Sequence, residues 1–189
     1  LNNEGTTFLH EKLEHLLSKA LDEELIEDAI ICKNDLERNK LWEIRENAAE
    51  NEKKELINSH AKKCLKHDIS LPINNIEKFH QETQKMISTK IKNTRTIFFG
   101  HLGDGNLHYN IFGNGKGDDG FENQSQNITE NLYKIIEKLN GSFSAEHGIG
   151  QLKKDNLRFF KDPVAYDLMK NIKNMIDPKN IMNPGKILI

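Results

Sequence analysis

Cysteine and long apolar runs are scarce in this chain of 189 residues. Its two cysteines, Cys32 and Cys64, do not form a CxxC or other close pairing, so a zinc ribbon or dithiol redox motif is excluded and a reducing compartment is expected. No segment approaches the roughly 18 consecutive apolar residues of a membrane helix, and the beginning lacks the basic start and apolar core of a signal peptide. The sequence therefore predicts a soluble, cytoplasmic protein with no integral membrane segment.

A large excess of positive or negative charge is also lacking. The formal net charge is -2 although 30% of the residues are charged, which argues against disorder and against a nucleic-acid partner. No P-loop, no GxSxG elbow and no strand followed by GxGxxG is present, and Gly148-x-Gly150 is too short to indicate nucleotide binding. A chain of this length can bury a core of its own, so one domain over residues 1–189 is expected.

Helical periodicity recurs along the chain. Thr6 or Thr7 is placed to cap the first helix, Asn74 with Glu77 forms a possible capping box, and Asp162-Pro163 is typical of a helix start. The helices expected from apolar spacing cover residues 8–21, 35 into 50–58, 74–91, 128–139 and 162–177.

Short apolar segments lie between these helices. A tight turn at Gly103-Asp104-Gly105 joins two of them and predicts a hairpin. The strands expected are 29–32, 64–71, 97–99, 107–112 and the extended piece 141–145, while 113–126 is rich in Gly, Asp and Asn and reads as a loop. This order favours an α+β fold, an antiparallel sheet with helices packed mainly on one face, in a ferredoxin-like arrangement.

Two histidines flank the predicted hairpin turn. If the chain reverses at Gly105, His101 and His108 are brought close enough to share a ligand, and strand alternation puts Asn110 on the same face as His108. Imidazole nitrogens suit zinc, iron or manganese, and a two-histidine site usually takes a carboxylate as third ligand. Histidines at a turn are also commonly capping or buried core residues, so spacing alone leaves both interpretations open.

A candidate third ligand lies in Ser144-Ala145-Glu146-His147-Gly148-Ile149-Gly150, at the end of an expected strand. The glycines permit a turn in which Glu146 and His147 both point into one cleft. Two histidines and one glutamate would leave coordination positions open for a substrate, as in catalytic metal sites.

Three motifs in order carry a family resemblance: GHLGDGNLHYN at 100–110, SAEHGIGQLK at 144–153 and NPGKIL at 183–188. Together they resemble the C-terminal domain of FAD-linked oxidases, a family that includes D-2-hydroxyglutarate dehydrogenase, D-lactate dehydrogenase and the glycolate oxidase catalytic subunit. The segments Leu41-Trp42-x-x-Arg45-Glu46 and Lys66-His67-Asp68-Ile69-Ser70-Leu71-Pro72 extend the resemblance over nearly the whole chain.

The resemblance implies a flavoprotein whose FAD lies in a separate N-terminal domain, which we expect to be absent from this chain. It implies that a D-2-hydroxyacid is oxidised to a 2-oxo acid with hydride transfer to FAD, and that the missing FAD-binding domain or subunit is a partner. The roles that it implies are a divalent metal, expected to be zinc, on His101, His108 and Glu146; substrate contacts from Arg45, Lys66, Asn110 and His147; His147 as the base; and a flavin-facing tail at Asn183.

The substrate stays open among D-lactate, glycolate and D-2-hydroxyglutarate. Dicarboxylate-specific members carry a hydroxyl residue four positions after the arginine, where this chain has Ala49. Two other functions compete with the dehydrogenase: a metal-dependent hydrolase that uses the same ligands to activate water, and an inactive stand-alone fragment that only binds metal. A homodimer is a further open alternative.

Overall fold

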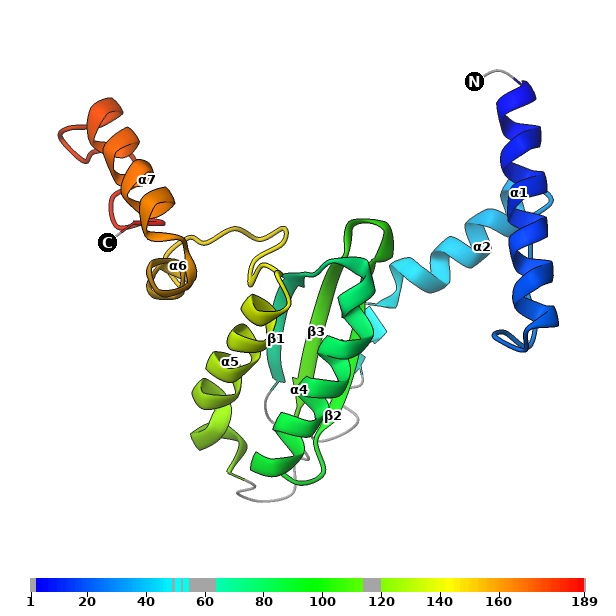
Figure 1. Ribbon diagram of the computed structural model, residues 1–189, viewed down its shortest axis with the longest axis horizontal. Coiled ribbons are helices and arrows are strands. Elements are labelled where there is room, and N and C mark those ends of the chain that lie inside the picture. The colour runs from blue at the N-terminus through cyan, green and yellow to red at the C-terminus, as the bar shows by residue number, and fades with distance from the viewer. Residues whose placement is uncertain (1–2, 49, 52, 55–63, 114–119, 189) are drawn as a thin grey trace. The chain divides into compact units, whose positions relative to one another are not determined.

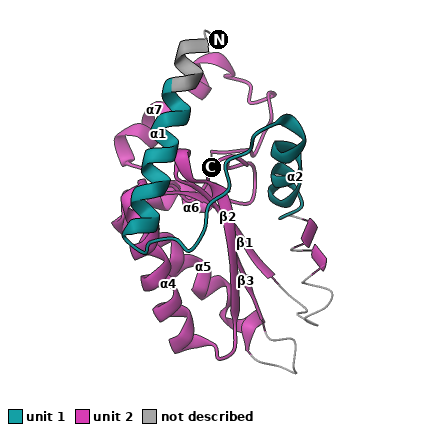
Figure 2. Cartoon of the chain, turned by 90° about the vertical axis from the view of Figure 1, so that its right-hand side faces the viewer, with its two compact units in different colours: residues 1–48 teal, residues 49–189 magenta. Residues whose placement is uncertain are grey.

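The computed structural model describes residues 3–48, 50–51, 53–54, 64–113 and 120–188. The chain divides into two compact units, Leu1–Ala48 and Ala49–Ile189 (Figure 2). Among the described residues, no helix has the length and apolar character needed to cross a bilayer.

The first unit holds helices α1 (Asn3–Asp22) and α2 (Asp35–Glu46). α1 begins before Thr6 and Thr7, so the prediction that one of them caps it is wrong. Asn34 caps α2 by accepting a hydrogen bond from the Glu37 amide at 2.9 Å. α2 ends at Glu46 and Asn47 forms a turn, but the described residues 48, 50–51 and 53–54 are helical again, as predicted; residues 55–63 lie outside the described part.

The strand expected at 29–32 is also wrong, because this segment is irregular. Ile30 is 71% exposed. A strand needs a paired neighbour to satisfy its backbone groups, and the described helices on either side offer none. A short apolar run alone therefore did not decide between strand and loop.

The second unit is built on an antiparallel sheet of three strands, in the order β1-β3-β2. The strands are β1 (Cys64–Ser70), β2 (Arg95–His101) and β3 (Asn106–Phe112). The predicted hairpin is confirmed as β2 and β3, joined by the short 3-10 helix η2 (Leu102–Asp104) and Gly105. Gly105 has φ 65° and a Cβ there would lie 1.9 Å from the Leu71 carbonyl oxygen, so the turn requires glycine.

Helices α4 (Ile76–Lys90) and α5 (Phe121–Lys138) pack on one face of this sheet (Figure 1). Strand alternation sends Ile69, Tyr109 and Ile111 toward them. The core joins these side chains to buried residues of the two helices, Phe79, Ile87, Ile128, Leu132 and Ile136. The predicted α+β class, with helices mainly on one face of an antiparallel sheet, is confirmed; the ferredoxin-like label stays a prediction.

Local differences concern helix ends. The 3-10 helix η1 (Ile73–Asn75) precedes α4, and no side chain caps α4, so the Asn74 and Glu77 capping box does not form. Asn75 instead donates a hydrogen bond to the Leu139 carbonyl at 2.9 Å. α5 begins at the buried Phe121, inside the segment predicted as a loop. The prediction missed this start because the first turns of α5 carry polar residues that face solvent.

After α5 the extended piece 141–145 contributes only one bridge, Ser142 to Ser70, at the end of β1. Helix α6 (Lys154–Phe160) was not predicted. Helix α7 (Pro163–Ile176) matches its prediction, with Asp162 accepting a hydrogen bond from the Ala165 amide at 2.9 Å.

Candidate active site

Several polar residues of the sheet gather on the face opposite α4 and α5. In the register, Asp68 of β1 and Phe99 of β2 lie on either side of His108 in β3. Two pairs further along, Lys66 lies beside Asn110. Because side chains on one face alternate along a strand, these residues all point to the same side of the sheet.

The turn that carries Glu146 and His147 is fastened to β1 by Asp68. One oxygen of this buried carboxylate, Oδ2, accepts hydrogen bonds from the amides of Glu146 and His147, each at 2.9 Å, and from Ala145 at 3.2 Å. Amide donors that converge on one carboxylate oxygen fix the backbone of a turn. Asp68 thereby brings the turn 145–147 onto the sheet face opposite α4 and α5.

The three predicted metal ligands lie near one another. Glu146 Oε2 is 3.7 Å from His108 Nε2, and Glu146 Oε1 is 3.9 Å from His101 Nε2. An ion with ligand bonds of about 2.0 to 2.2 Å joins donor atoms up to about 4.4 Å apart. Both pairs fall within that reach, although each histidine approaches a different oxygen of Glu146, and the ligand set stays a prediction.

Glu146 is held from the other side by Asn106, whose side-chain amide donates a short hydrogen bond to Oε1. Asn106 is buried at the beginning of β3. A carboxylate with a fixed orientation is better suited to bind an ion than a freely rotating one.

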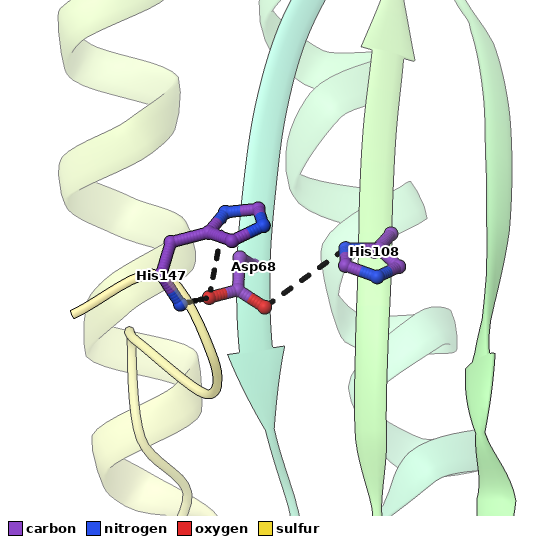
Figure 3. Close-up of side chains that lie close together, drawn as sticks. All are labelled: Asp68, His108 and His147. Carbon is purple, nitrogen blue, oxygen red and sulfur yellow. Dashed lines mark hydrogen bonds and ion pairs between the residues drawn. The ribbon is translucent and has the colours of Figure 1, made fainter. Parts of the chain in front are cut away.

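Among the described residues, the group whose possible ligand atoms all lie close to one another is a different one, which shares only His108 with the predicted set. One atom each from Asp68, His108 and His147 lies within 4.8 Å of the others (Figure 3). The imidazoles of His108 and His147 are stacked, with ring centroids 5.7 Å apart. His108 thus takes part in both groups, between Glu146 and Asp68.

A cavity of roughly 530 Å³ opens beside these side chains. Its wall includes four residues that the sequence analysis assigned to substrate or metal: Lys66, His108, Asn110 and His147. Asp68, Phe99 and the segment Gly148–Lys153 complete most of the lining. The cavity has space for a small organic acid and provides lysine amines and an amide to bind it.

Charges around the cavity influence each other. Burial alone would raise the pKa of Asp68, but the amide hydrogen bonds from His147 and Glu146 and the nearby charges of His147 and Lys153 outweigh it, so the pKa lies below its ordinary value. Burial lowers the pKa of Lys153, an effect that the negative charge of Asp68 opposes. Asp68 is therefore a carboxylate at neutral pH.

The remaining predicted positions are Arg45, Ala49 and Asn183. Arg45 belongs to α2 in the first unit, and Ala49 is outside the described residues. Asn183 lies in the C-terminal tail with φ 49°. The tail is tied to the site loop at Ile187, whose amide donates to the Gly150 carbonyl at 2.7 Å.

Sequence reasoning missed Asp68 and Lys153 as site residues, although both lie inside quoted motifs. Lys153 closes SAEHGIGQLK and donates hydrogen bonds to the Phe143 carbonyl and the Ser144 hydroxyl at 3.2 and 3.1 Å. The available signal for Asp68 was its spacing: it lies two residues after Lys66, on the same face of the strand.

The fold and site define a class of protein that comparison with known families supports. The family described as FAD linked oxidases, C-terminal domain, matches residues 3–187. The chain therefore belongs to this family.

Within this family, the chain is similar to several proteins that carry the same name. The chain is 34% identical over 161 residues to the D-2-hydroxyglutarate dehydrogenase of Stutzerimonas stutzeri, covering 85% of this chain and 33% of that protein. It is also 34% identical to mitochondrial D-2-hydroxyglutarate dehydrogenases of Arabidopsis thaliana and Danio rerio, over 94% and 97% of this chain and 30% and 32% of theirs. The chain spans about a third of the length of these relatives.

Proposed function

We propose that this chain forms the C-terminal, substrate-binding and metal-binding part of a flavin-dependent D-2-hydroxyacid dehydrogenase. The observation that carries the proposal is the cavity in which two prospective carboxylate-binding residues, Lys66 and Asn110, meet His108 and His147. The family membership supports the flavin, and the relatives' names support a 2-hydroxyacid. The family membership favours the dehydrogenase over a metal-dependent hydrolase, although a hydrolase would use the same ligands.

Different residues of the cavity contact different groups of the substrate. The Lys66 amine attracts the substrate carboxylate, and the Asn110 amide donates a hydrogen bond to it. Phe99 gives the cavity an apolar wall that excludes water from one side. With the carboxylate fixed, the 2-hydroxyl of a short acid reaches toward His108 and His147.

His147 is the proposed base. A neutral imidazole removes the hydroxyl proton while the hydrogen on C2 leaves as hydride to the flavin. When bound to His101, His108 and Glu146, a divalent metal supplies a positive charge that lowers the pKa of the substrate hydroxyl. The FAD would be held mainly by a separate domain, with Asn183 in the tail as this chain's proposed contribution, and Arg45 as a further carboxylate ligand.

We propose D-2-hydroxyglutarate as the first substrate to test, because the relatives bear that name. D-lactate and glycolate are the alternatives, since Ala49 replaces the hydroxyl residue of dicarboxylate-specific members. The cytoplasmic location stays a prediction, as relatives from Oryza sativa and Arabidopsis thaliana carry the word mitochondrial in their names. The homodimer likewise stays a prediction.

The test is complementation. The 189-residue chain alone should be colourless and should not reduce a dye with any of the three acids. Co-expression with a flavin-binding domain from the same gene or operon should give a yellow protein that reduces the dye. A yellow and active preparation of the chain alone would contradict the domain assignment, and a yellow complex that oxidises none of the acids would support the inactive fragment.

A further inference from the structure

Asp68 occupies a central position between two imidazoles (Figure 3). Its side chain is only 4% exposed. Oδ2 accepts the three amide hydrogen bonds of the turn 145–147, whereas Oδ1 has no hydrogen-bond partner among the described residues. A buried carboxylate oxygen without a donor is costly, so a positive or polar neighbour is expected for it.

Both neighbouring histidines turn the same ring nitrogen toward this carboxylate. His147 Nδ1 lies 3.7 Å from Oδ2, and His108 Nδ1 lies 3.9 Å from Oδ1. These distances are longer than hydrogen bonds, yet the negative charge of Asp68 favours a proton on Nδ1 of His147. His108 lies between two carboxylates, because its Nε2 is 3.7 Å from Glu146 Oε2, so Asp68 favours the Nδ1 proton of His108 only when Nε2 binds an ion. A neutral imidazole protonated at Nδ1 has an unprotonated Nε2.

The Nε2 atoms of the two rings are in the positions that the proposed chemistry needs. His108 Nε2 is the atom that lies 3.7 Å from Glu146 Oε2. A metal-binding imidazole coordinates through its unprotonated nitrogen, while a carboxylate behind the ring holds the other proton. A base likewise accepts a proton only through an unprotonated nitrogen.

We propose that Asp68 is a positioning residue that fixes the turn 145–147 and keeps the ring proton of His147 on Nδ1. The carboxylate thereby directs His147 Nε2 to the substrate hydroxyl, and it lies behind the His108 ring when His108 Nε2 binds the metal. The roles of the two Nε2 atoms rest on the proposed function, whereas the turn and the ring proton of His147 are properties of this chain.

Asp177 provides a matched control. This carboxylate is also buried, and it accepts backbone hydrogen bonds from Ile181 at 3.0 Å and Met182 at 2.9 Å. Its charged partner is Lys173 rather than a histidine. Replacing Asp177 with Asn therefore removes a buried, turn-holding carboxylate without changing the surroundings of the site histidines.

The experiment measures ring tautomers of the 189-residue chain by long-range ¹H–¹⁵N NMR, above pH 8 where imidazoles are neutral, and zinc affinity by titration with Zn²⁺. In the metal-free wild type, the His147 ring should carry the proton on Nδ1. Asp68→Asn should shift this ring toward the Nε2 form, move the amide signals of residues 145–147, and weaken zinc binding roughly 10-fold to 100-fold. Asp177→Asn should change none of these.

Four outcomes decide between the explanations. A wild-type His147 ring protonated on Nε2 would overturn the proposal without any variant, as would an Asp68→Asn protein whose His147 keeps the Nδ1 proton. If Asp68→Asn and Asp177→Asn weaken zinc binding equally and leave the His147 tautomer unchanged, Asp68 has only a structural role. A wild type that has the Nδ1 tautomer of His147 but takes up no Zn²⁺ would support the Asp68 proposal and refute the proposed metal site.

Discussion

His108 Nε2 and Glu146 Oε2 lie 3.7 Å apart, although the two residues belong to separate motifs. The strand register places His108 beside Asp68, and Asp68 in turn holds the backbone of Glu146. The proximity of the two residues therefore depends on a third that belongs to neither motif. It also provides the first quantity to test, the affinity for a divalent ion.

We expect the purified chain to take up one divalent ion, and His108→Ala to weaken its binding roughly 10-fold or more, since that variant removes one of three ligands. The measurement is elemental analysis together with titration of metal-free protein. His10→Ala is the control, because His10 is an exposed histidine on α1 that pairs only with Glu14 at 3.4 Å among the contacts described. Absence of metal in protein never exposed to chelator, with no uptake on titration, would refute the site.

Substitutions of the neighbours Glu146 and His147 should have different effects on metal binding. Glu146→Gln removes a charged ligand and should lower the metal affinity, whereas His147→Asn should leave the metal content intact. Both variants keep the backbone amides that bind Asp68, so the turn should persist in each. If His147→Asn loses the metal and Glu146→Gln keeps it, the assigned roles are exchanged and the group of Asp68, His108 and His147 becomes the better ligand set.

Gly105→Ala should destabilise the second unit. The backbone has φ 65° there, and the added Cβ would lie 1.9 Å from the Leu71 carbonyl oxygen, so the hairpin turn must distort. We expect a loss of about 2 kcal/mol or more in the free energy of unfolding, measured by urea titration. Gly103→Ala is the matched control, because nothing lies within 4 Å of a Cβ at that position. Equal losses in the two variants would contradict this account of the turn.

His67 should make stability depend on pH. Burial on the helix-covered face lowers its pKa from 6.5 to about 4, against the opposing effect of its hydrogen bond with the Tyr109 carbonyl. The unfolded chain takes up a proton near pH 6.5 and the folded chain only near pH 4, so this stabilisation is present above pH 6.5 and is lost as pH falls toward 4.

Between pH 7 and pH 5 the loss from His67 should be about 2 kcal/mol in the free energy of unfolding. Urea unfolding at both values measures it, and His67→Gln should remove that part of the difference. His10→Gln, which replaces an exposed histidine, should leave the difference unchanged. A His67→Gln difference equal to that of the wild type would show that His67 is protonated in the folded chain.

Sequence patterns predicted the elements whose local signals agree with their tertiary surroundings. The period-2 alternation of β3 and the Gly105 turn gave the hairpin, and the Asp162-Pro163 pair gave the start of α7. The strand expected at 29–32 failed because pairing with another strand, which is a tertiary property, decides the structure of a short apolar run.

Site residues that belong to family motifs could be predicted from the sequence. Roles that depend on contacts between distant parts of the chain could not. Motif residues His108, Asn110, Lys66 and His147 do line one cavity. The role of Asp68 follows only from its hydrogen bonds to a turn far away in the sequence, which spacing does not reveal. Arg45 lies in the first compact unit, whereas the cavity lies in the second. Its predicted role therefore depends on how the two units are arranged, which the motifs and the fold of the second unit do not determine.

The central claim is that His147 removes the substrate proton beside a flavin, and rapid mixing of the complex with D-2-hydroxyglutarate, D-lactate or glycolate tests it most directly. The complex of this chain with its flavin-binding domain should lose its yellow colour within one turnover for at least one acid. His147→Asn should slow this bleaching by roughly 10² to 10⁴ with unchanged metal content, because a positioned base contributes about that much. Bleaching of the His147→Asn complex at the wild-type rate would contradict the account.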